Sequence, residues 1–201
     1  MSKIVKTDRI LRRLGVNLWG KPNAAITTRR NKPGNHGTKP ARVSDYGLKL
    51  IEKQKLRTYY NMNEKPFKRL FKLAQNTQSN QANEFVRILE SKLQTFVYRM
   101  SWSSTMHGAR QLVSHGHVLV NSKRVNIKSF ILQEGDVVEL VNKAKEMTVV
   151  LNSIAGKIGN VPGYIEVIDQ FTGKFIRKPE LIEVPFESRM NPQAVIEYYT
   201  R

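Results

Sequence analysis

The chain has 201 residues, no cysteine, and 34 Lys and Arg against 16 Asp and Glu, which gives a net charge of +18. A basic excess of this size is typical of proteins that neutralise phosphates, so nucleic acid is the expected partner. The absence of cysteine excludes disulfides and thiolate zinc sites. No run of about eighteen apolar residues is present, so we expect no membrane partner.

Most of the excess charge lies in the first third of the chain. Residues 1–60 carry 15 Lys and Arg against 3 Asp and Glu, a net charge of +12, whereas residues 141–201 have a net charge of +1. Residues 1–43 contain few apolar residues and several turns rich in glycine and proline, so we expect an irregular basic extension. Two interpretations stay open, a solvated tail or a segment that becomes ordered on RNA.

Two amphipathic helices should follow this extension. Ser44 is a suitable N-cap for the first, which would run to residue 60 with Tyr46, Leu50 and Ile51 facing inward. The second should begin near Asn63 with a proline in its first turn. Its inward residues have helical spacing: Phe67, Leu70, Phe71 and Ala74.

Residues 89–130 have the pattern of two short helices followed by a tight β-hairpin. The apolar residues of the first helix are Leu89, Leu93, Phe96, Val97 and Met100. Those of the second helix are Ala109, Leu112 and Val113. Gly116 is placed to end that helix in a left-handed conformation, and Asn121 with Ser122 should form the hairpin turn.

The same segment carries polar and cationic residues that its core does not need. In the second helix Arg110, Gln111, Ser114 and His115 lie opposite the apolar residues. On the return strand of the hairpin the corresponding residues are Lys123, Arg124 and Asn126. A compact unit with these side chains on one side favours a nucleic-acid-binding surface.

The C-terminal third has a different character. Residues 142–160 should be partly helical, residues 164–168 and 173–177 should pair as strands, and Asn191 should cap a last helix. Its apolar residues gather at 184–186 and 195–199. Because this segment is nearly neutral, we expect it to pack against the helices of residues 44–75 and to face a neighbouring protein.

Catalytic and metal-binding patterns are weak. The sequence lacks a phosphate-binding loop, a nucleophile elbow and a dinucleotide fingerprint. His36, His107, His115 and His117 do not have the spacing of a zinc site. We therefore expect no enzyme, no metal and no cofactor. Trp19 and Trp102 could stack on bases, but core packing is the more common role of such isolated aromatics.

Several motifs follow one another in a fixed order: PGNHG at 33–37, SDYGLKL at 44–50, KQKLR at 53–57, VYRM at 97–100, ARQLVSHGH at 109–117 and VIEYY at 195–199. Together they resemble the small-subunit ribosomal protein S4 family of bacteria and organelles, over nearly the whole chain. The segment 89–130 alone is similar to a module of pseudouridine synthases, a tyrosyl-tRNA synthetase and stress proteins.

The resemblance implies an α+β fold with a mainly helical first domain and an inserted S4-type RNA-binding module of two helices and a small antiparallel sheet. The expected division is a basic extension at 1–43, a discontinuous helical domain at 44–88 and 153–201, and the module at 89–152.

The resemblance also implies a structural constituent of the small ribosomal subunit. The expected partners are a junction in the 5′ domain of small-subunit ribosomal RNA, neighbouring small-subunit ribosomal proteins, and mRNA near the channel through which it enters. Nucleation of subunit assembly and a contribution to decoding accuracy follow from the same likeness. The alternative is an RNA-modifying or stress-response protein that uses the same module, which would need a catalytic domain or a much shorter chain.

Three positions depart from the family pattern. Lys92 stands where the family usually has Arg, Met106 where a basic residue is common, and Gly108 where an acidic capping partner is usual. The first two departures predict weaker cationic contacts from the module and a larger share of binding from the N-terminal third. The third predicts a slightly frayed helix start.

The sequence and the resemblance together give a set of candidate RNA-binding residues. They are Arg9, Arg12, Arg13, Arg29, Arg30, Lys32, His36, Lys39, Arg42, Lys55, Arg57, Lys92, Arg99, Thr105, Arg110, Gln111, Ser114, His115, Asn121, Lys123, Arg124 and Asn126.

The expected location is a ribosome, either in the mitochondrial matrix as an organelle-encoded protein or in a bacterial cytoplasm. The likeness begins within the first few residues, which leaves no room for a targeting presequence. WGKP at 19–22 and GNVPG at 159–163 resemble α-proteobacterial members, and a composition rich in Lys, Asn and Ile favours an A·T-rich mitochondrial genome.

Overall fold

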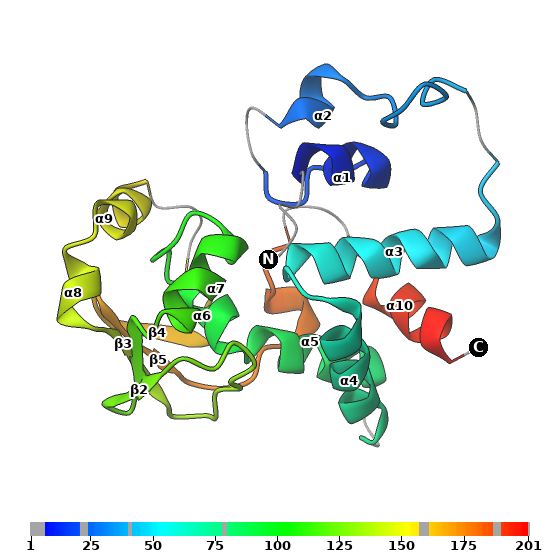
Figure 1. Ribbon diagram of the computed structural model, residues 1–201. Helices are drawn as coiled ribbons and strands as arrows, with labels where there is room; N and C mark the ends of the chain where they lie inside the picture. Colours follow the sequence, from blue (N-terminus) through cyan, green and yellow to red (C-terminus); the bar gives the residue numbers. More distant parts are fainter. Residues whose placement is uncertain are drawn as a thin grey trace. The chain divides into compact units, whose positions relative to one another are not determined.

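The computed structural model describes residues 7–20, 24–39, 42–77, 80–156, 161–186 and 190–200. The fold is α+β, as expected, with short helices and one small antiparallel sheet (Figure 1). The chain forms two compact units, Met1–Met62 with Phe186–Arg201, and Asn63–Pro185. The bounds of these units differ from those of the expected extension 1–43, helical domain 44–88 with 153–201 and module 89–152, and that functional division stays a prediction.

The first unit contains α1 (Thr7–Leu14), α2 (Ala25–Thr28), α3 (Asp45–Tyr59) and α10 (Pro192–Tyr199). The expectation of an irregular extension is wrong where α1 and α2 form. Leu11 and Leu18 are both 0% exposed, so a few aliphatic residues on one side of α1 and after it suffice to build a core. Residues 1–6, 21–23, 40 and 41 of that stretch lie outside the described residues.

Helix α3 begins where the sequence predicts. The Ser44 side chain accepts a hydrogen bond from the Gly47 N–H at 3.2 Å, which satisfies one of the free donors of the first turn. Its buried residues are Lys53, Leu56 and Tyr59. Tyr46, which we expected to face inward, is 50% exposed. Its ring instead packs at the surface against Tyr198 of α10.

Helix α10 packs along α3, which confirms part of the expected burial of the C-terminus (Figure 1). Asn191 caps it by accepting from the Ala194 N–H at 3.2 Å. Val195 and Ile196 are buried between the two helices. At the rim, the Lys49 ammonium lies 2.8 Å from the Glu197 carboxylate.

The second unit begins with α4 (Glu64–Gln75), α5 (Gln81–Glu90), α6 (Leu93–Arg99) and α7 (Met106–Ser114). The buried face of α4 is formed by Phe67, Phe71 and Ala74, as expected. The first module helix is shorter than predicted, because α5 ends at Glu90 and a short break separates it from α6. Leu89 therefore belongs to the preceding helix.

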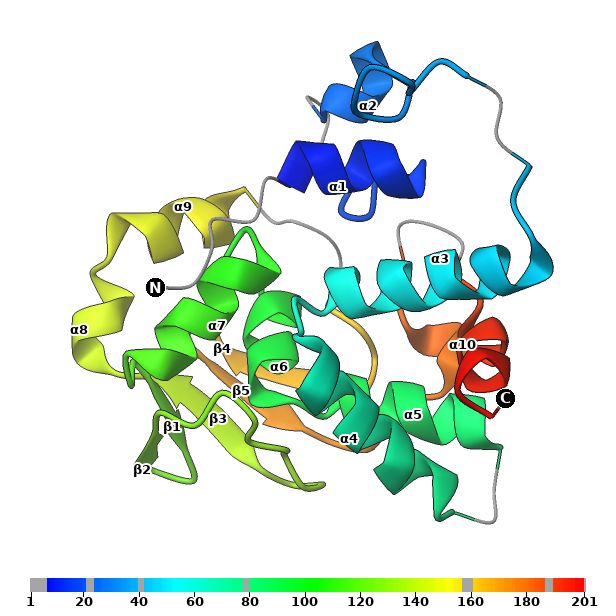
Figure 2. The same ribbon diagram turned by 45° about the vertical axis from the view of Figure 1, so that its right-hand side comes forward.

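A five-stranded antiparallel sheet in the order β2-β1-β3-β5-β4 completes the second unit (Figure 2). Its strands are β1 (Val118–Val120), β2 (Lys123–Val125), β3 (Val137–Leu140), β4 (Ile165–Asp169) and β5 (Thr172–Phe175). Two short helices, α8 (Asn142–Lys145) and α9 (Thr148–Ala155), connect β3 to β4, and a 3-10 turn (Leu181–Glu183) follows β5. Residues 157–160 of the expected helical stretch lie outside the described residues.

The sheet packs closely against α6 and the turn after it. A Cβ on Gly173 of β5 would lie 2.8 Å from the Met100 methyl and 3.2 Å from the Phe96 ring, so a larger residue there would require the Met100 side chain to move. Trp102 is fully buried, and its indole N–H donates to the Gln170 carbonyl at 3.0 Å. Trp102 is therefore a core residue, and base stacking by its ring is excluded.

The hairpin has the predicted turn. Asn121 and Ser122 have φ of 49° and 64°, the pair of left-handed conformations that joins two twisted strands through a two-residue loop. Gly116 ends α7 with φ of 68°. None of the described helices is long and apolar enough to cross a membrane.

Candidate nucleic-acid interface

The first unit presents a set of exposed basic side chains on and after α1. They are Arg9, Arg13, Arg29, Arg30, Lys32, His36, Lys39 and Arg42. None of them forms an ion pair with a carboxylate within the described part of the chain. We call these eight residues the N-terminal cationic surface. Such a surface attracts phosphates by charge and carries no base sequence information by itself.

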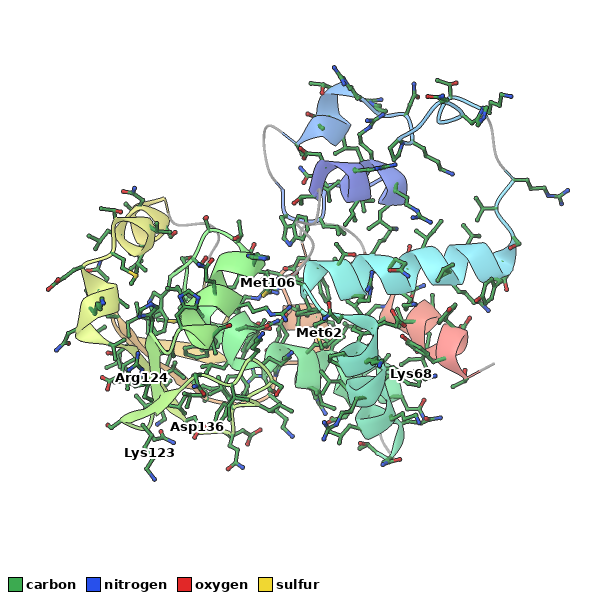
Figure 3. All side chains as sticks on the ribbon, in the orientation of Figure 1. Met62, Lys68, Met106, Lys123, Arg124 and Asp136 are labelled. Atoms are coloured by element: carbon green, nitrogen blue, oxygen red, sulfur yellow. The ribbon has the colours of Figure 1, made fainter. Side chains whose placement is uncertain are left out.

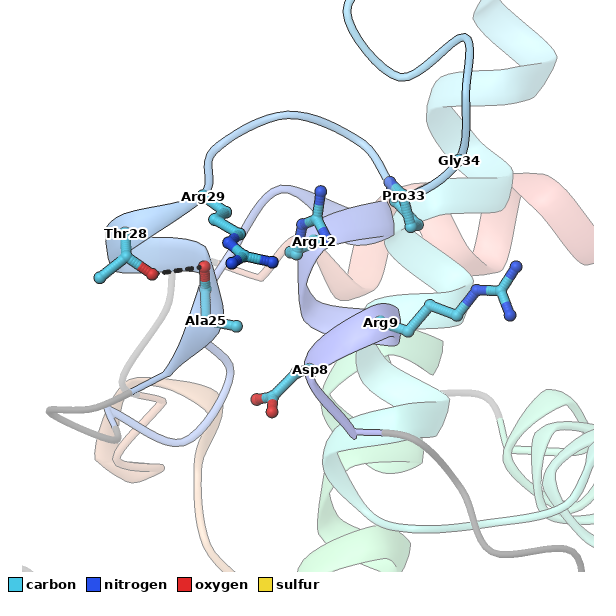
Figure 4. A pocket seen from close by; sticks show the side chains of 8 residues that line it. All are labelled: Asp8, Arg9, Arg12, Ala25, Thr28, Arg29, Pro33 and Gly34. Carbon is cyan, nitrogen blue, oxygen red and sulfur yellow. Dashed lines mark hydrogen bonds between the residues drawn. The ribbon is translucent and has the colours of Figure 1, made fainter.

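A hollow of about 630 Å³ lies between α1, α2 and the loop after α2. Figure 4 shows the side chains that line it, from Asp8, Arg9, Arg12, Ala25, Thr28, Arg29, Pro33 and Gly34. Three of the eight are arginines and one is an aspartate, so the hollow has a net positive lining. Its net positive lining suits a phosphate group.

Arg12 has a structural role in addition to its charge. Its Nε donates to the Asn31 carbonyl at 3.0 Å and its Nη2 to the Lys32 carbonyl at 3.4 Å. These bonds tie the loop after α2 to α1. They explain why a segment that looks irregular in sequence has a defined path.

The two predicted residues on α3 are less available. The Lys55 ammonium lies 2.6 Å from the Glu52 carboxylate, which neutralises part of its charge. Arg57 is half-buried. Both lie on the same unit as the N-terminal cationic surface.

On the second unit, the exposed side of α7 and the hairpin form a second surface. Gln111, His115, Lys123 and Asn126 are exposed, while Arg110 and Ser114 are half-buried. Figure 3 shows Lys123 and Arg124 on β2. We call these seven residues the module surface. Arg124 joins the hairpin to the end of α7 through the Gly116 and His115 carbonyls, and a single RNA-binding surface formed by all seven residues stays a prediction.

Burial and the positive charges of this surface lower the pKa of the neighbouring His117. Burial lowers the pKa of His117 below its usual value, and the charges of His115, Arg124 and Lys143 lower it further. Like charges at the end of α7 therefore disfavour another proton. A site of this kind is better occupied by an anion than by a cation.

Several predicted residues also hold the module together. The Thr105 hydroxyl accepts from the Gly108 N–H at 3.0 Å and caps α7. The Asn121 amide donates to Asp136 at 2.8 Å and accepts from the Val137 N–H at 3.0 Å. Substituting either residue would change the fold as well as any RNA contact.

Arg124 also combines two roles. Its Nε donates to the Gly116 carbonyl at 2.6 Å and its Nη2 to the His115 carbonyl at 3.3 Å. The guanidinium thus satisfies free carbonyls at the C-terminus of α7, where a positive charge is favourable. Arg124 therefore positions the hairpin against α7.

Two of the predicted RNA contacts are buried. Arg99 is 7% exposed, and its Nη2 and Nε donate to the two Glu90 carboxylate oxygens at 2.8 and 3.1 Å. Lys92 is 5% exposed and pairs in the backbone with Ile131. Every residue from 88 to 103 is buried, which disfavours RNA contact by Arg99 and Lys92, and their contact with RNA stays a prediction.

The buried Lys92 predicts an unusual pH dependence of stability. Burial, and to a smaller extent the charge of Arg110, lowers the pKa of Lys92 to about 8. Between this value and the ordinary pKa near 10.5 the unfolded chain holds a proton that the folded chain has lost, so stability rises with pH. Denaturation with urea should show a gain of about 1 kcal/mol from pH 7 to pH 9 that Lys92→Met lacks. The exposed control Lys128→Met should keep the gain, and an equal gain in both variants would contradict the assignment to Lys92.

A further set of cations was missed by the sequence reasoning. Lys65, Lys68, Arg69 and Lys72 are exposed on α4, opposite Phe67 and Phe71. Their spacing of three and four residues is the signal that could have identified them. The sequence pattern was used to predict only the buried apolar side of this helix.

The comparisons with known proteins agree with this geometry. Residues 4–90 match the ribosomal protein S4/S9 N-terminal domain, and residues 91–138 match the S4 domain. A protein of Acidiphilium cryptum named small ribosomal subunit protein uS4 is 45% identical over 195 residues, which is 96% of each chain. The chain belongs to the ribosomal protein S4 family. Relatives of the same name from Rhodospirillum rubrum and Rickettsia felis are 40% and 42% identical, and the matches cover 99% and 100% of their lengths and all of this chain.

Within the S4 domain of this family member, Arg110 is the cation on α7 whose removal should affect RNA binding most. Arg110→Ala is expected to weaken binding to ribosomal RNA by about 1–3 kcal/mol, the usual size of one charge-assisted hydrogen bond to a phosphate. Filter binding measures this change. Unchanged affinity with a lowered melting temperature would show that Arg110 acts only within the fold.

Proposed function

We propose that this chain is a non-enzymatic structural protein of the small ribosomal subunit and binds its ribosomal RNA. The observation that carries the proposal is the match over nearly the full length to proteins named small ribosomal subunit protein uS4. The N-terminal cationic surface and the module surface support it, because each is suited to phosphates. The alternative of an RNA-modifying or stress-response protein is less well supported, since the relatives are named small ribosomal subunit proteins and the matches cover 96% and 99% of their lengths.

The finer parts of the proposal concern place and partners. We infer that the RNA target is a junction in the 5′ domain, where binding would nucleate assembly of the subunit. The nearly neutral C-terminal third supports contacts with neighbouring ribosomal proteins, and a position near the mRNA channel would link the chain to decoding accuracy. The Lys-, Asn- and Ile-rich composition supports a mitochondrial ribosome in preference to a bacterial one.

The dependence of RNA affinity on salt tests which of the two surfaces makes most of the phosphate contacts. If about six phosphates are neutralised, the log of the affinity should fall with the log of the salt concentration with a slope of roughly −4 to −5. A variant with five cations of the N-terminal cationic surface replaced by Gln should show a slope whose magnitude is smaller by more than half. The five are Arg9, Arg13, Arg29, Arg30 and Lys39. Substitution is preferable to deletion, because Leu11 and Leu18 belong to the core.

The matched control replaces Lys65, Lys68, Arg69 and Lys72 of α4 by Gln, which removes a similar charge from another exposed helix. This control is expected to reduce the magnitude of the slope by less than the N-terminal variant does. Equal slopes for the wild type and the N-terminal variant would contradict the proposal that the N-terminal cationic surface carries most phosphate contacts.

A further inference from the structure

A second cavity in the first unit has a lining that phosphate binding alone does not explain. It measures about 520 Å³ and lies between α1 and α3, where we call it the α1–α3 groove. Its volume lies within the range of roughly 300–1,000 Å³ that is usual for small-molecule sites. Ile10 and Leu14 line it from α1, and Leu50 and Ile51 line it from α3. All four side chains are half-buried, so an apolar floor remains in contact with solvent.

The rim of this groove is cationic. The exposed Arg13 and Lys32 line it and belong to the N-terminal cationic surface, and Arg57, whose Nε is buried, also lines it. No carboxylate is among the described residues that line it. Gln54, one turn from Leu50 on α3, contributes an amide that can both donate and accept a hydrogen bond. Apolar floor, amide and cationic rim are thus within one cavity.

The apolar floor, the amide and the cations each suit a different part of a nucleotide. An apolar floor suits the face of a base, an amide suits its hydrogen-bonding edge, and cations on the rim suit the flanking phosphates. A phosphate alone would gain nothing from four aliphatic side chains. An uncharged lipid tail or an apolar side chain of another protein would place no anion beside Arg13 and Lys32.

We propose that the α1–α3 groove binds one unstacked nucleobase of the RNA, with Leu50 and Ile51 against its face and Gln54 at its edge. This inference rests on the proposed function, since it assigns a base contact to a protein that otherwise contacts phosphates. It gives the N-terminal third a means of recognising a particular nucleotide in a bulge or junction, where bases are free to leave the stack.

Filling the groove without changing charge tests the inference. Leu50→Trp places a larger side chain in the groove, whereas Leu48→Trp places the same side chain on the 55% exposed Leu48 of the same helix. Leu50→Trp is expected to lower the affinity for transcribed 5′-domain RNA about tenfold, the effect of removing one stacked base, with an unchanged salt slope. Leu48→Trp should stay within about twofold of the wild type, because it lies outside the groove.

A second measurement locates the base. RNA that contains 4-thiouridine or 6-thioguanosine is cross-linked to the full chain by light, and mass spectrometry identifies the joined peptide and nucleotide. We expect a cross-link to residues 7–14 or 45–59. Removing that base to leave an abasic site should then weaken wild-type binding about tenfold and leave Leu50→Trp unchanged. Gln54→Leu, which keeps the helix and removes the amide, provides the same comparison if Leu50→Trp melts at a lower temperature.

The outcomes separate this inference from the proposed function. If the wild type binds 5′-domain RNA and both Trp variants bind equally well, the groove does not hold a base and the inference is wrong. If Leu50→Trp binds RNA normally but enters small subunits poorly, the occupant is a neighbouring protein, and the inference is also wrong. If the wild type does not prefer the ribosomal RNA at all, the proposed function itself fails.

Discussion

Replacing Arg99 with Ala is expected to destabilise the second unit by about 3–5 kcal/mol, the cost of leaving a buried charge without its partner. The side chains of Arg99 and Glu90 are 6% and 0% exposed, and two hydrogen bonds join them. The Tyr164 hydroxyl donates to the same carboxylate at 2.7 Å. Urea denaturation followed by Trp102 fluorescence measures the effect, in a Trp19→Phe background so that only the second unit is observed.

Variants of the partners distinguish a charge effect from a simple change in packing. Glu90→Leu combined with Arg99→Leu removes both charges and should cost less than Arg99→Ala. Tyr164→Phe removes one hydrogen bond and should cost about 1–2 kcal/mol. If the double variant is less stable than Arg99→Ala, the ion pair is not what makes that single substitution costly.

The same cluster predicts sensitivity to alkali. Burial, and next the negative charge of Glu90, raises the pKa of the Tyr164 hydroxyl far above its usual value of 10.0. Above about pH 10 the unfolded chain therefore loses a proton that the folded chain keeps, and stability falls as pH rises. Tyr164→Phe should remove this part of the alkaline loss, which urea denaturation at pH 9 and pH 11 measures.

Removal of residues 190–201 is expected to destabilise the first unit by several kcal/mol. Val195 and Ile196 are no longer available to pack against α3, and Lys53 loses the ring of Tyr198, which lies 5.0 Å from its ammonium. Hydrogen exchange of the full chain and the truncated chain measures the change for each helix. Protection should fall in α3 and remain in α6 and α7.

The single substitution Gln193→Ala, at an exposed position of α10, is the matched control and should leave exchange unchanged. Equal loss of protection in α7 would contradict the two-unit organisation. Protection in α3 that is unchanged by the truncation would show that the packing of α10 contributes little to stability.

The sequence predicted the elements whose signals are local. Caps and turn residues located the start of α3, the end of α7 and the hairpin, because Ser44, Gly116 and Asn121 act on their own neighbours. Helical spacing identified the buried face of α4 in the same way. The order of motifs identified the family.

The sequence did not predict features that depend on distant parts of the chain, such as the burial of two cations and the formation of α1. Cations on a helix suggest solvent or a partner molecule, but Arg99 and Lys92 lie in a segment that is surrounded on all sides, so the two became buried groups. The environment of Arg99 depends on Glu90 and Tyr164, and that of Lys92 on Ile131 and Arg110, which no local pattern reveals. Helix α1 was not predicted because Leu11 is its one buried residue, and because Arg12 holds the loop after α2 through backbone carbonyls that no sequence pattern reveals.

Competition between RNA molecules tests the central claim most directly. The full chain is mixed with labelled 5′-domain RNA of the small subunit, and unlabelled tRNA or an unrelated duplex is added at about 0.15 M salt. We predict that the 5′-domain RNA binds at least about a hundredfold more tightly than either competitor, since specific complexes exceed charge-driven binding by such factors or more. Equal competition by all three would contradict the account and leave only a general affinity for polyanions.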